Sequence, residues 1–228
     1  MASLLDALLP YFALMTIALF VVAVLIWLFP CHGLDMLRHP EEWKDLGKSG
    51  EQIAYITLTN KIHVPKNQIL RNVYIPTADG KTSEIDLLVV SKKGLLVFEC
   101  KNYAGNIYGD AKKIKWVQYL GKKKSYFYSP ILQNRNHVKH LKKFLAEFGD
   151  LPMIPFVATI TRGKWKVKNL SKTDYLLGYN CHLKDILDTT PDSELMAKHF
   201  KAILRKLTPL SRPGEDVEKK HVEQIKLT

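Results

Sequence analysis

The stretch from residue 83 to residue 101 constrains the fold of this chain more than any other. It reads SEIDLLVVSKKGLLVFECK, so two apolar runs flank an SKKG turn. Apolar runs of this length around such a turn are typical of a β-hairpin. A hairpin brings the outer ends of its two strands together, and both outer ends here carry acidic residues. We therefore expect carboxylates to gather at the open end of a hairpin.

The register of this hairpin decides whether the acidic side chains meet. If Lys92-Lys93 form a two-residue loop, Asp86 faces Glu99 across the hairpin. Glu84 then faces Lys101, and all of these side chains lie on one face. Opposed carboxylates repel each other unless a cation lies between them. Oxygen ligands of this kind suit Mg²⁺ or Mn²⁺, so this register predicts a metal site.

A second register is open. Gly94 can instead supply the left-handed residue of a three-residue loop with a bulge. Asp86 would then lie opposite Cys100, and the carboxylates would not meet. Apart from the question of register, the hairpin can simply have charged ends, with Glu84 and Lys101 as a surface ion pair that contributes little. Residue spacing alone leaves both registers open.

The remaining pattern predicts an α/β domain around the hairpin. Besides the hairpin, the expected strands are 68–76, 113–119, 123–128 and 153–160, and the expected helices are 51–58, 131–148, 183–187 and 193–207. Hairpin strands come first and a helical crossover follows. This order is typical of a mixed sheet flanked by helices.

The N-terminal segment is apolar enough to enter a membrane. No charged residue occurs from Ala7 to Cys31, a run of 25 residues. At about 1.5 Å per residue, such a helix can cross a hydrocarbon core of roughly 30 Å. Residues 8–30 are therefore predicted to form a transmembrane helix. A cleaved signal peptide fits less well because the start lacks a basic region, and a buried core helix fits less well because 17–29 is apolar on every face.

Charges beside this segment predict its orientation. Asp6 precedes it, whereas basic residues follow it at Arg38, Lys44 and Lys48. The positive-inside rule then places the C-terminal domain in the cytoplasm of a single-pass membrane protein. The expected organisation is a transmembrane anchor over 1–31, a linker over 32–46, the α/β domain over 47–210 and a polar tail over 211–228.

Cysteine usage fits a reducing compartment. Cys31, Cys100 and Cys181 are odd in number and lack the paired spacing of a disulfide framework. Cys100 is expected to point away from its acidic neighbours into the core. His137 and His140 have a spacing that can bind zinc, with Cys181-His182 as conceivable partners, but no second close pair completes such a site.

Basic residues gather in two regions of a chain whose formal net charge is +12. One acid-free run is interleaved with Trp116, Tyr119, Tyr126 and Tyr128, and the other surrounds Trp165. The lysines and arginine expected to contact nucleic acid are Lys112, Lys113, Lys115, Lys122, Lys123, Lys124, Arg162 and Lys164. Lysines can follow a phosphate backbone while aromatic rings stack on unpaired bases. A solvated hairpin with inward-facing aromatics and a surface for anionic lipid are the alternatives.

The hairpin and several further segments resemble known nucleases. Asp86, the strand and turn that follow it, and Glu99-Cys100-Lys101 resemble the Asp…Glu-x-Lys core of the PD-(D/E)xK nuclease superfamily. More closely, the chain resembles the nuclease-related domain, NERD, over about residues 47–145. The matching segments are GKSGE at 47–51, EID at 84–86, GLLVFECKN at 94–102, GNI at 105–107, Trp116, and SPILQ at 129–133. An ordered set of segments is more specific than one motif. Ser129 departs from the family's usual Asn, and Glu84 from its frequent Gln.

The resemblance implies a metal centre. It assigns Asp86 and Glu99 as metal ligands, with the backbone carbonyl of Cys100 as a third oxygen. Glu51, on the first helix of the domain, matches the family's extra acidic position and is a further candidate ligand. The implied metal is Mg²⁺ or Mn²⁺, and no small-molecule cofactor is implied.

The resemblance also implies the remaining catalytic residues and the fold. Lys101 is the implied water-activating residue, and Gln133 the implied contact to the metal-bound water or the phosphate. The implied catalytic set is therefore Glu51, Asp86, Glu99, Lys101 and Gln133. The implied fold is α/β, a restriction-endonuclease-like mixed β-sheet flanked by helices.

Together these observations predict a membrane-anchored, metal-dependent nuclease that hydrolyses phosphodiester bonds in DNA. Such hydrolysis needs a metal to neutralise the phosphate, an oriented water and a cation near the developing charge. Two other classes stay open. One is a non-catalytic, membrane-tethered nucleic-acid-binding module that keeps the fold and the basic surface. The other is a membrane-associated scaffold that binds anionic lipid through its lysines.

Overall fold

A computed structural model describes residues 11, 12, 14–21, 46–159, 163–178, 183–212 and 214–226. The chain divides into two units, Met1–Asp45 and Leu46–Thr228. In the first unit, the described residues 11, 12 and 14–21 are helical. Within the described ranges, no helix combines the length and the apolar character needed to cross a membrane. Most of the predicted span 8–30 lies outside those ranges.

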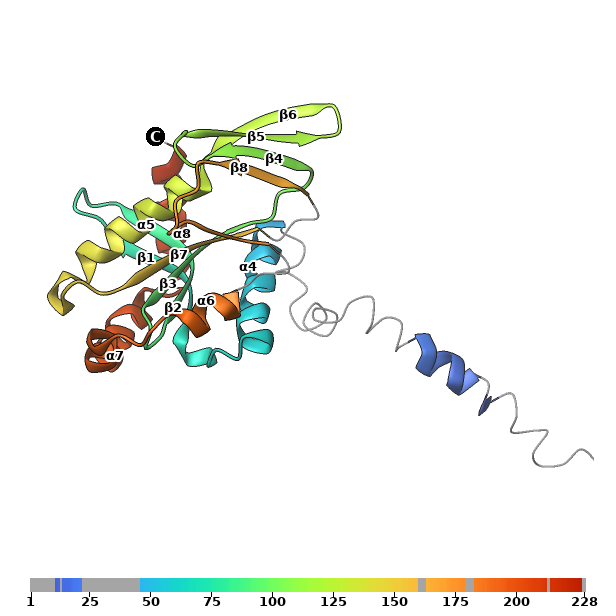
Figure 1. Cartoon of the computed structure of the whole chain (residues 1–228), viewed down its shortest axis with the longest axis horizontal. Helices are drawn as coiled ribbons and strands as arrows, with labels where there is room; N and C mark the ends of the chain where they lie inside the picture. Colours follow the sequence, from blue (N-terminus) through green and yellow to red (C-terminus); the bar gives the residue numbers. More distant parts are fainter. Residues whose placement is uncertain are drawn as a thin grey trace, which may run out of the picture. The chain divides into compact units, whose positions relative to one another are not determined.

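The second unit is built on a five-stranded mixed sheet (Figure 1). Its strands are β1 (Ile69–Pro76), β2 (Thr82–Val90), β3 (Leu95–Lys101), β7 (Met153–Thr159) and β9 (Tyr175–Leu177). They lie in the order β1-β2-β3-β7-β9, with β1, β2 and β3 antiparallel and β3, β7 and β9 parallel. The α/β class and the mixed sheet are confirmed. The hairpin β2-β3 occupies the middle of the sheet, so its apolar runs are buried on both faces.

A second, four-stranded mixed sheet stands beside the first, whereas the sequence predicted only one (Figure 1). It contains β4 (Asn106–Asp110), β5 (Lys115–Leu120), β6 (Lys123–Tyr128) and β8 (Trp165–Lys168). The order is β6-β5-β4-β8, and only the β4-β8 pair is parallel. The two sheets separate because Ile107 and Trp116 are buried in a core of their own, with Ile131 and Val157. The single-sheet expectation is therefore wrong.

Helices cover both faces of the first sheet. They are α4 (Leu46–Ile56), α5 (Pro130–Phe144), α6 (Leu183–Thr189), α7 (Glu194–Leu207) and α8 (Glu215–Lys226). One core contains Leu141 of α5 and Ile203 of α7 together with Val97 of β3. The opposite core contains Ala54 of α4 together with Leu87 and Phe98 of the hairpin. Alternate residues of β3 thus pack against α5 and α4.

The C-terminal region differs from the expected loose tail. Of residues 211–228, those from Glu215 to Lys226 form α8, and Ser211 forms a β-bridge with Val73. His221 of α8 is only 8% exposed. The side chain of Gln224 accepts a hydrogen bond from the backbone N–H of Thr82, 3.2 Å away. Polar contacts of this kind help to dock the helix on β2.

Candidate functional site

The turn of the hairpin settles its register. The backbone N–H of Ser91 donates to the carbonyl oxygen of Gly94 at 3.1 Å, and that of Gly94 donates back at 3.4 Å. Lys92-Lys93 therefore form a two-residue loop, and Leu87 pairs with Phe98 further along the ladder. The predicted register is confirmed, and the alternative with a three-residue loop is wrong.

Asp86 lies just beyond the last paired residues of this ladder. The backbone N–H of Cys100 donates to its Oδ2 at 2.6 Å. Burial raises the pKa of Asp86 well above its usual value, and the nearby charges of Glu99 and Glu51 raise it further. Three carboxylates therefore share one region of low polarity, an arrangement that favours a cation. The Cys100 side chain packs on the opposite face, against the core beneath α4, as expected.

Glu99 is fully buried and has a positively charged neighbour. The Lys101 ammonium lies 2.5 Å from its Oε1, and the imidazole Nε2 of His137 lies 3.0 Å from its Oε2. Burial alone would raise the pKa of Glu99, but the hydrogen bond with His137 and the charge of Lys101 hold it below its usual value. Glu99 is therefore ionised, and its two oxygens face Lys101 and His137.

Lys101 is positively charged because carboxylates surround its ammonium group. Burial would lower the pKa of its ammonium, but the carboxylates of Glu99 and Asp86 outweigh burial and raise it above its usual value. In this arrangement Lys101 can donate hydrogen bonds and stabilise negative charge. Lys101 could take a proton from water only if its pKa fell, which requires that the negative charges of these two carboxylates be neutralised.

His137 connects Glu99 to a second strand. Its Nδ1 lies 2.8 Å from the hydroxyl of Ser83, so a chain of contacts runs from β2 through α5 to β3. Sequence reasoning considered His137 only as a zinc ligand beside His140 and did not find this role. A signal was present: Gln133 and His137 are four residues apart on one helix and therefore lie on the same face. Ser129 caps this helix by accepting a hydrogen bond from the N–H of Leu132.

Glu51 is held near the hairpin by Asn72. The carboxamide nitrogen of Asn72 donates to Glu51 Oε2 at 3.0 Å and to Glu84 Oε1 at 3.3 Å. Asn72 has a φ of 47°, a left-handed conformation that Asn adopts more readily than most residues. Burial raises the pKa of Glu51, and the charge of Glu84 adds to the effect. Asn72 is a second residue that the sequence analysis missed.

A pocket of about 360 Å³ opens beside these carboxylates. Asp86 lines it together with Gln133 and His137 of α5 and Tyr128 at the end of β6. His221 of α8 completes the lining on another side. The predicted residues Asp86 and Gln133 are therefore brought to one pocket, with Glu99 and Lys101 adjoining Asp86 through the contacts described above.

His221 forms part of the wall through specific contacts. Its Nδ1 lies 2.8 Å from the Thr82 hydroxyl, and its Nε2 lies 3.5 Å from Glu84 Oε2. The ring also packs edge-on against Tyr74, with the ring centres 5.3 Å apart. Burial lowers the pKa of His221, although the charge of Glu84 acts in the opposite direction. The C-terminal helix therefore contributes directly to the candidate site.

The acidic residues beside the pocket offer some of the ligands that a divalent cation requires. Among the residues that the structure describes, no three or more His, Cys, Asp or Glu side chains are grouped to hold a metal ion. Mg²⁺ does not need such a cage, because it keeps several waters and is commonly bound by one or two carboxylates. Asp86, whose charge is repelled by the neighbouring carboxylates, and Glu99, whose pKa is held below its usual value, fit that requirement.

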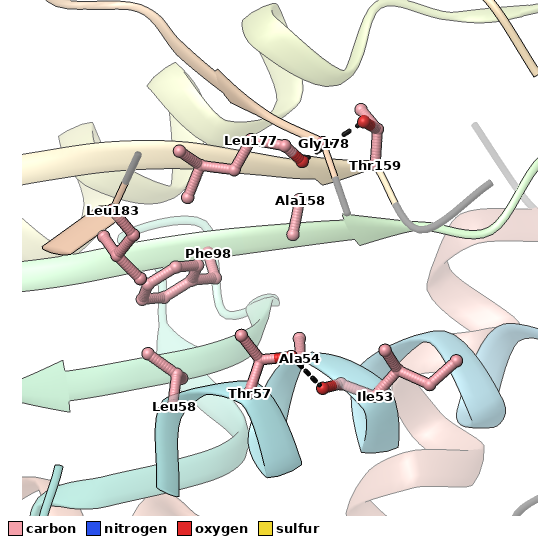
Figure 2. A pocket seen from close by; sticks show the side chains of 10 residues that line it. All are labelled: Ile53, Ala54, Thr57, Leu58, Phe98, Ala158, Thr159, Leu177, Gly178 and Leu183. Atoms are coloured by element: carbon pink, nitrogen blue, oxygen red, sulfur yellow. Dashed lines mark hydrogen bonds between the residues drawn. The ribbon is translucent and has the colours of Figure 1, made fainter. Parts of the chain in front are cut away.

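A separate pocket lies on the other face of the first sheet and has a different character (Figure 2). It measures about 40 Å³ and is lined by residues of α4, β3, β7 and β9, including Ala54, Phe98 and Ala158. None of the described residues that line it has a titratable side chain, and their hydroxyls are internally bonded: Thr159 donates to the Leu177 carbonyl oxygen at 3.2 Å. None of the candidate site residues Glu51, Asp86, Glu99, Lys101 and Gln133 is among these lining residues.

The residues predicted to contact nucleic acid are surface residues of the second sheet. The lysines at 112, 113, 115, 122, 123, 124 and 164 are all exposed, and Arg162 lies outside the described residues. Of the interleaved aromatics, Trp116 is buried, whereas Tyr119 and Tyr126 are exposed. The alternative with inward-facing aromatics is thus correct for the tryptophan and wrong for these tyrosines. Cys181 and His182, considered as zinc ligands, also lie outside the described residues.

Comparison with known proteins places the chain in a family. The nuclease-related domain matches residues 46–160, a range that runs from α4 through β7 and contains the whole carboxylate hairpin. The chain belongs to the NERD family. NERD domains are part of the PD-(D/E)xK-like nuclease superfamily. The chain is also 31% identical over 212 residues to an uncharacterized protein, pXO1-01, of Bacillus anthracis, an alignment that covers 92% of this chain and 97% of that protein. No solved structure matches the chain.

Proposed function

We propose that this NERD protein is a Mg²⁺- or Mn²⁺-dependent nuclease that hydrolyses phosphodiester bonds in DNA. The observation that carries the proposal is the hairpin register, which brings Asp86, Glu99 and Lys101 together beside a pocket. Membership in a nuclease-related family supports it. The proposal includes anchoring by residues 8–30 with the catalytic domain in the cytoplasm, as the charge pattern predicts.

The residues of the site have distinct tasks in this proposal. Asp86 and Glu99 would hold the metal ion, with the Cys100 carbonyl and Glu51 as further candidate ligands. When bound, the ion supplies the positive charge that neutralises the phosphate and lowers the pKa of water. Lys101 is charged and partly buried, so its ammonium can orient the attacking water and stabilise negative charge that develops on the phosphate.

Residues on α5 and β2 support this arrangement. Gln133 lines the pocket with Asp86 and can donate or accept hydrogen bonds at the phosphate or the water. His137 and Ser83 hold the Glu99 carboxylate from the other side. Such supporting hydrogen bonds fix the orientation of a ligand carboxylate and tune its affinity for a metal.

A cleavage assay on the full chain tests the proposal. Labelled DNA is incubated with Mg²⁺, Mn²⁺ or a chelator, and the wild type is compared with Asp86→Asn and Lys101→Met. We expect metal-dependent cleavage by the wild type and a loss of about 100-fold or more in each variant. Asp188→Asn and Lys184→Met are matched controls, because these residues form an exposed ion pair on α6, 2.5 Å apart, and should leave cleavage unchanged.

Equal cleavage by the wild type, Asp86→Asn and Lys101→Met would reject the mechanism. Absence of cleavage with every divalent metal would reject the enzymatic function itself. A specific observation favours a non-catalytic nucleic-acid-binding module as the second candidate. Glu99 already has a cationic partner in Lys101 and a second partner in His137, so its burial is compensated without a metal. Salt-dependent DNA binding without cleavage would support that candidate.

A further inference from the structure

The outer face of the second sheet concentrates exposed tyrosines. Among the described residues of the second unit, the exposed tyrosines are Tyr108, Tyr119, Tyr126 and Tyr128, with exposed fractions of 40%, 38%, 61% and 45%. All of them lie on β4, β5 or β6. Tyr108 pairs with Val117, which in turn pairs with Tyr126, and paired residues share one face of a sheet. We call this surface the tyrosine face.

The apolar half of the same sheet packs inward. Trp116, Ile107 and Phe127 occupy the alternate positions and belong to the core beneath the sheet. The tyrosines are therefore not needed for the core of this sheet. Their exposure leaves large flat rings in contact with solvent, which is unusual without a binding partner when such rings are grouped.

Lysines are interleaved with these rings. The Lys124 ammonium lies 5.1 Å from the ring centre of Tyr126 and 5.8 Å from that of Tyr119. Lys166, on the neighbouring strand β8, lies 5.6 Å from the ring centre of Tyr108. The lysines that the pairing places on this face are Lys115, Lys124, Lys166 and Lys168. The carboxylate of Asp110, at the end of β4, accepts hydrogen bonds from the backbone N–H of Lys112 and from the side-chain amide of Asn169.

The face also has a recess of suitable size. Asn106, Tyr108, Val117 and Tyr119 line a hollow of about 580 Å³, within the usual range for sites that bind small organic groups. The rings of Tyr108 and Tyr119 stand perpendicular to each other at its sides, with centres 5.6 Å apart. The Asn106 side chain is exposed there and offers both hydrogen-bond donors and acceptors.

The tyrosine face leads to the carboxylate pocket. Tyr128, on the same side of β6 as Tyr126, is the last residue of that strand and lines the pocket together with Asp86. Its hydroxyl lies 3.5 Å from the carboxamide nitrogen of Asn136 on α5. A polymer bound along β6 therefore reaches the candidate catalytic residues without leaving the surface.

We infer that the tyrosine face binds an unpaired segment of a nucleic-acid strand and directs it into the carboxylate pocket. The inference rests on the proposed function and names its substrate class: a strand with unpaired bases. Ring stacking requires an accessible base face, which a base in the middle of a duplex does not offer. Lysines between the rings match the phosphates that separate successive bases.

Fluorescence anisotropy of the full chain tests this inference. The probes are a labelled single strand and a labelled blunt duplex of the same length, measured in chelator so that no cleavage occurs. We expect the single strand to bind about tenfold tighter or more, because only its bases have faces free to stack on the tyrosine rings. Tyr119→Leu and Tyr126→Leu should each weaken single-strand binding about tenfold and leave duplex binding nearly unchanged.

Phenylalanine variants provide the matched control. Tyr119→Phe and Tyr126→Phe keep a ring of the same shape, so single-strand binding should stay within about twofold of the wild type. If the Leu and Phe variants behave alike, stacking is not the source of affinity and the inference fails. Cross-linking of a photoreactive single strand to Tyr119 or Tyr126, located by mass spectrometry, would give independent support.

If the tyrosine face binds a different ligand, the binding measurements should give different results. Equal affinity for the single strand and the duplex would overturn the inference. So would binding to anionic vesicles that a single strand does not displace, or self-association that the Leu variants abolish. Because binding is measured without metal, a lack of nuclease activity would not alter the result. Conversely, nuclease activity that ignores unpaired segments would refute the role of the tyrosine face and leave the proposed function intact.

Discussion

The imidazole Nε2 of His137 lies 3.0 Å from the Glu99 Oε2, and both side chains are buried. This contact joins helix α5 to the end of strand β3. The other ring nitrogen contacts Ser83 on β2. A carboxylate at the end of a strand is thereby held in one orientation from two neighbouring elements, so the geometry of the candidate site depends on residues outside its acidic motif.

Replacing His137 by Leu should reduce both stability and metal affinity. The substitution removes a hydrogen-bond partner from buried Glu99, which costs about 1–3 kcal/mol in the free energy of unfolding. Loss of such a supporting contact also weakens metal binding about 10- to 100-fold. Urea unfolding and Mn²⁺ calorimetry measure the two effects. Ser83→Ala is the control, because it leaves the contact between His137 and Glu99 in place and should lower metal affinity much less.

Asp86→Asn should stabilise the metal-free protein while abolishing its response to metal. The Asp86 charge is disfavoured by burial and by Glu99 and Glu51, whereas an Asn carbonyl can still accept the hydrogen bond from the Cys100 N–H. In chelator, the melting temperature should therefore rise, by about 2–4 °C for each kcal/mol gained. Added Mn²⁺ should raise the melting temperature of the wild type only. A lower melting temperature of the variant in chelator would contradict this account.

Acidification should loosen α8 through His221. Its folded-state pKa lies below the usual 6.5, mainly because the ring is buried, while Glu84 partly opposes the shift. The ring faces Thr82 and Tyr74, and the charge of nearby His137 also disfavours its protonation. A lowered folded-state pKa stabilises the docked helix above pH 6.5, and this contribution is lost as the pH falls through the folded-state pKa.

Hydrogen exchange measures this effect. Amide protection in residues 215–226 should decrease from about pH 7.5 to about pH 5.5, after correction for the intrinsic exchange rate. Protection in β3 serves as the internal reference. In His221→Gln, protection of the helix should no longer depend on pH over this interval. Protection that stays constant or increases in the acidified wild type would refute the role of His221.

Gly109→Ala should destabilise the second sheet. A Cβ at this position would overlap the indole of Trp116, which is fully buried and donates a hydrogen bond to the Asp110 carbonyl oxygen at 3.0 Å. Overpacking of this kind costs about 1–3 kcal/mol in the free energy of unfolding. Gly178→Ala is the control, because nothing lies within 4 Å of a Cβ there. Urea unfolding compares the two, and equal stabilities would argue against close packing at Gly109.

The elements with strong local patterns could be predicted from the sequence. The hairpin followed from the turn and the flanking apolar runs, whereas the choice between the two-residue loop at Lys92-Lys93 and a three-residue loop needed the structure. Helix α5 has a capping Ser129 and a Pro130 at its start, which mark its beginning. These features depend on residues that are close together in the sequence, so they can be predicted from a single sequence.

The missed elements depend on contacts between distant parts of the chain. Strand β8 is short and pairs with β4 through Ile107 and Trp165, which are far apart in the sequence. The role of Asn72 needs a left-handed conformation within a strand, which no neighbouring residue indicates. The contact between Ser83 and His137 needs the packing of α5 on the sheet. Sequence reasoning found the residues of the acidic motif and not those that hold them.

His221 joins parts of the chain that are far apart in sequence. Its contact with Thr82 closes a loop of 139 residues. Closing a long loop costs more chain entropy than closing a short one, such as the turn at Lys92-Lys93. We therefore expect the hairpin to form early in folding and the wall of the pocket that α8 supplies to form late.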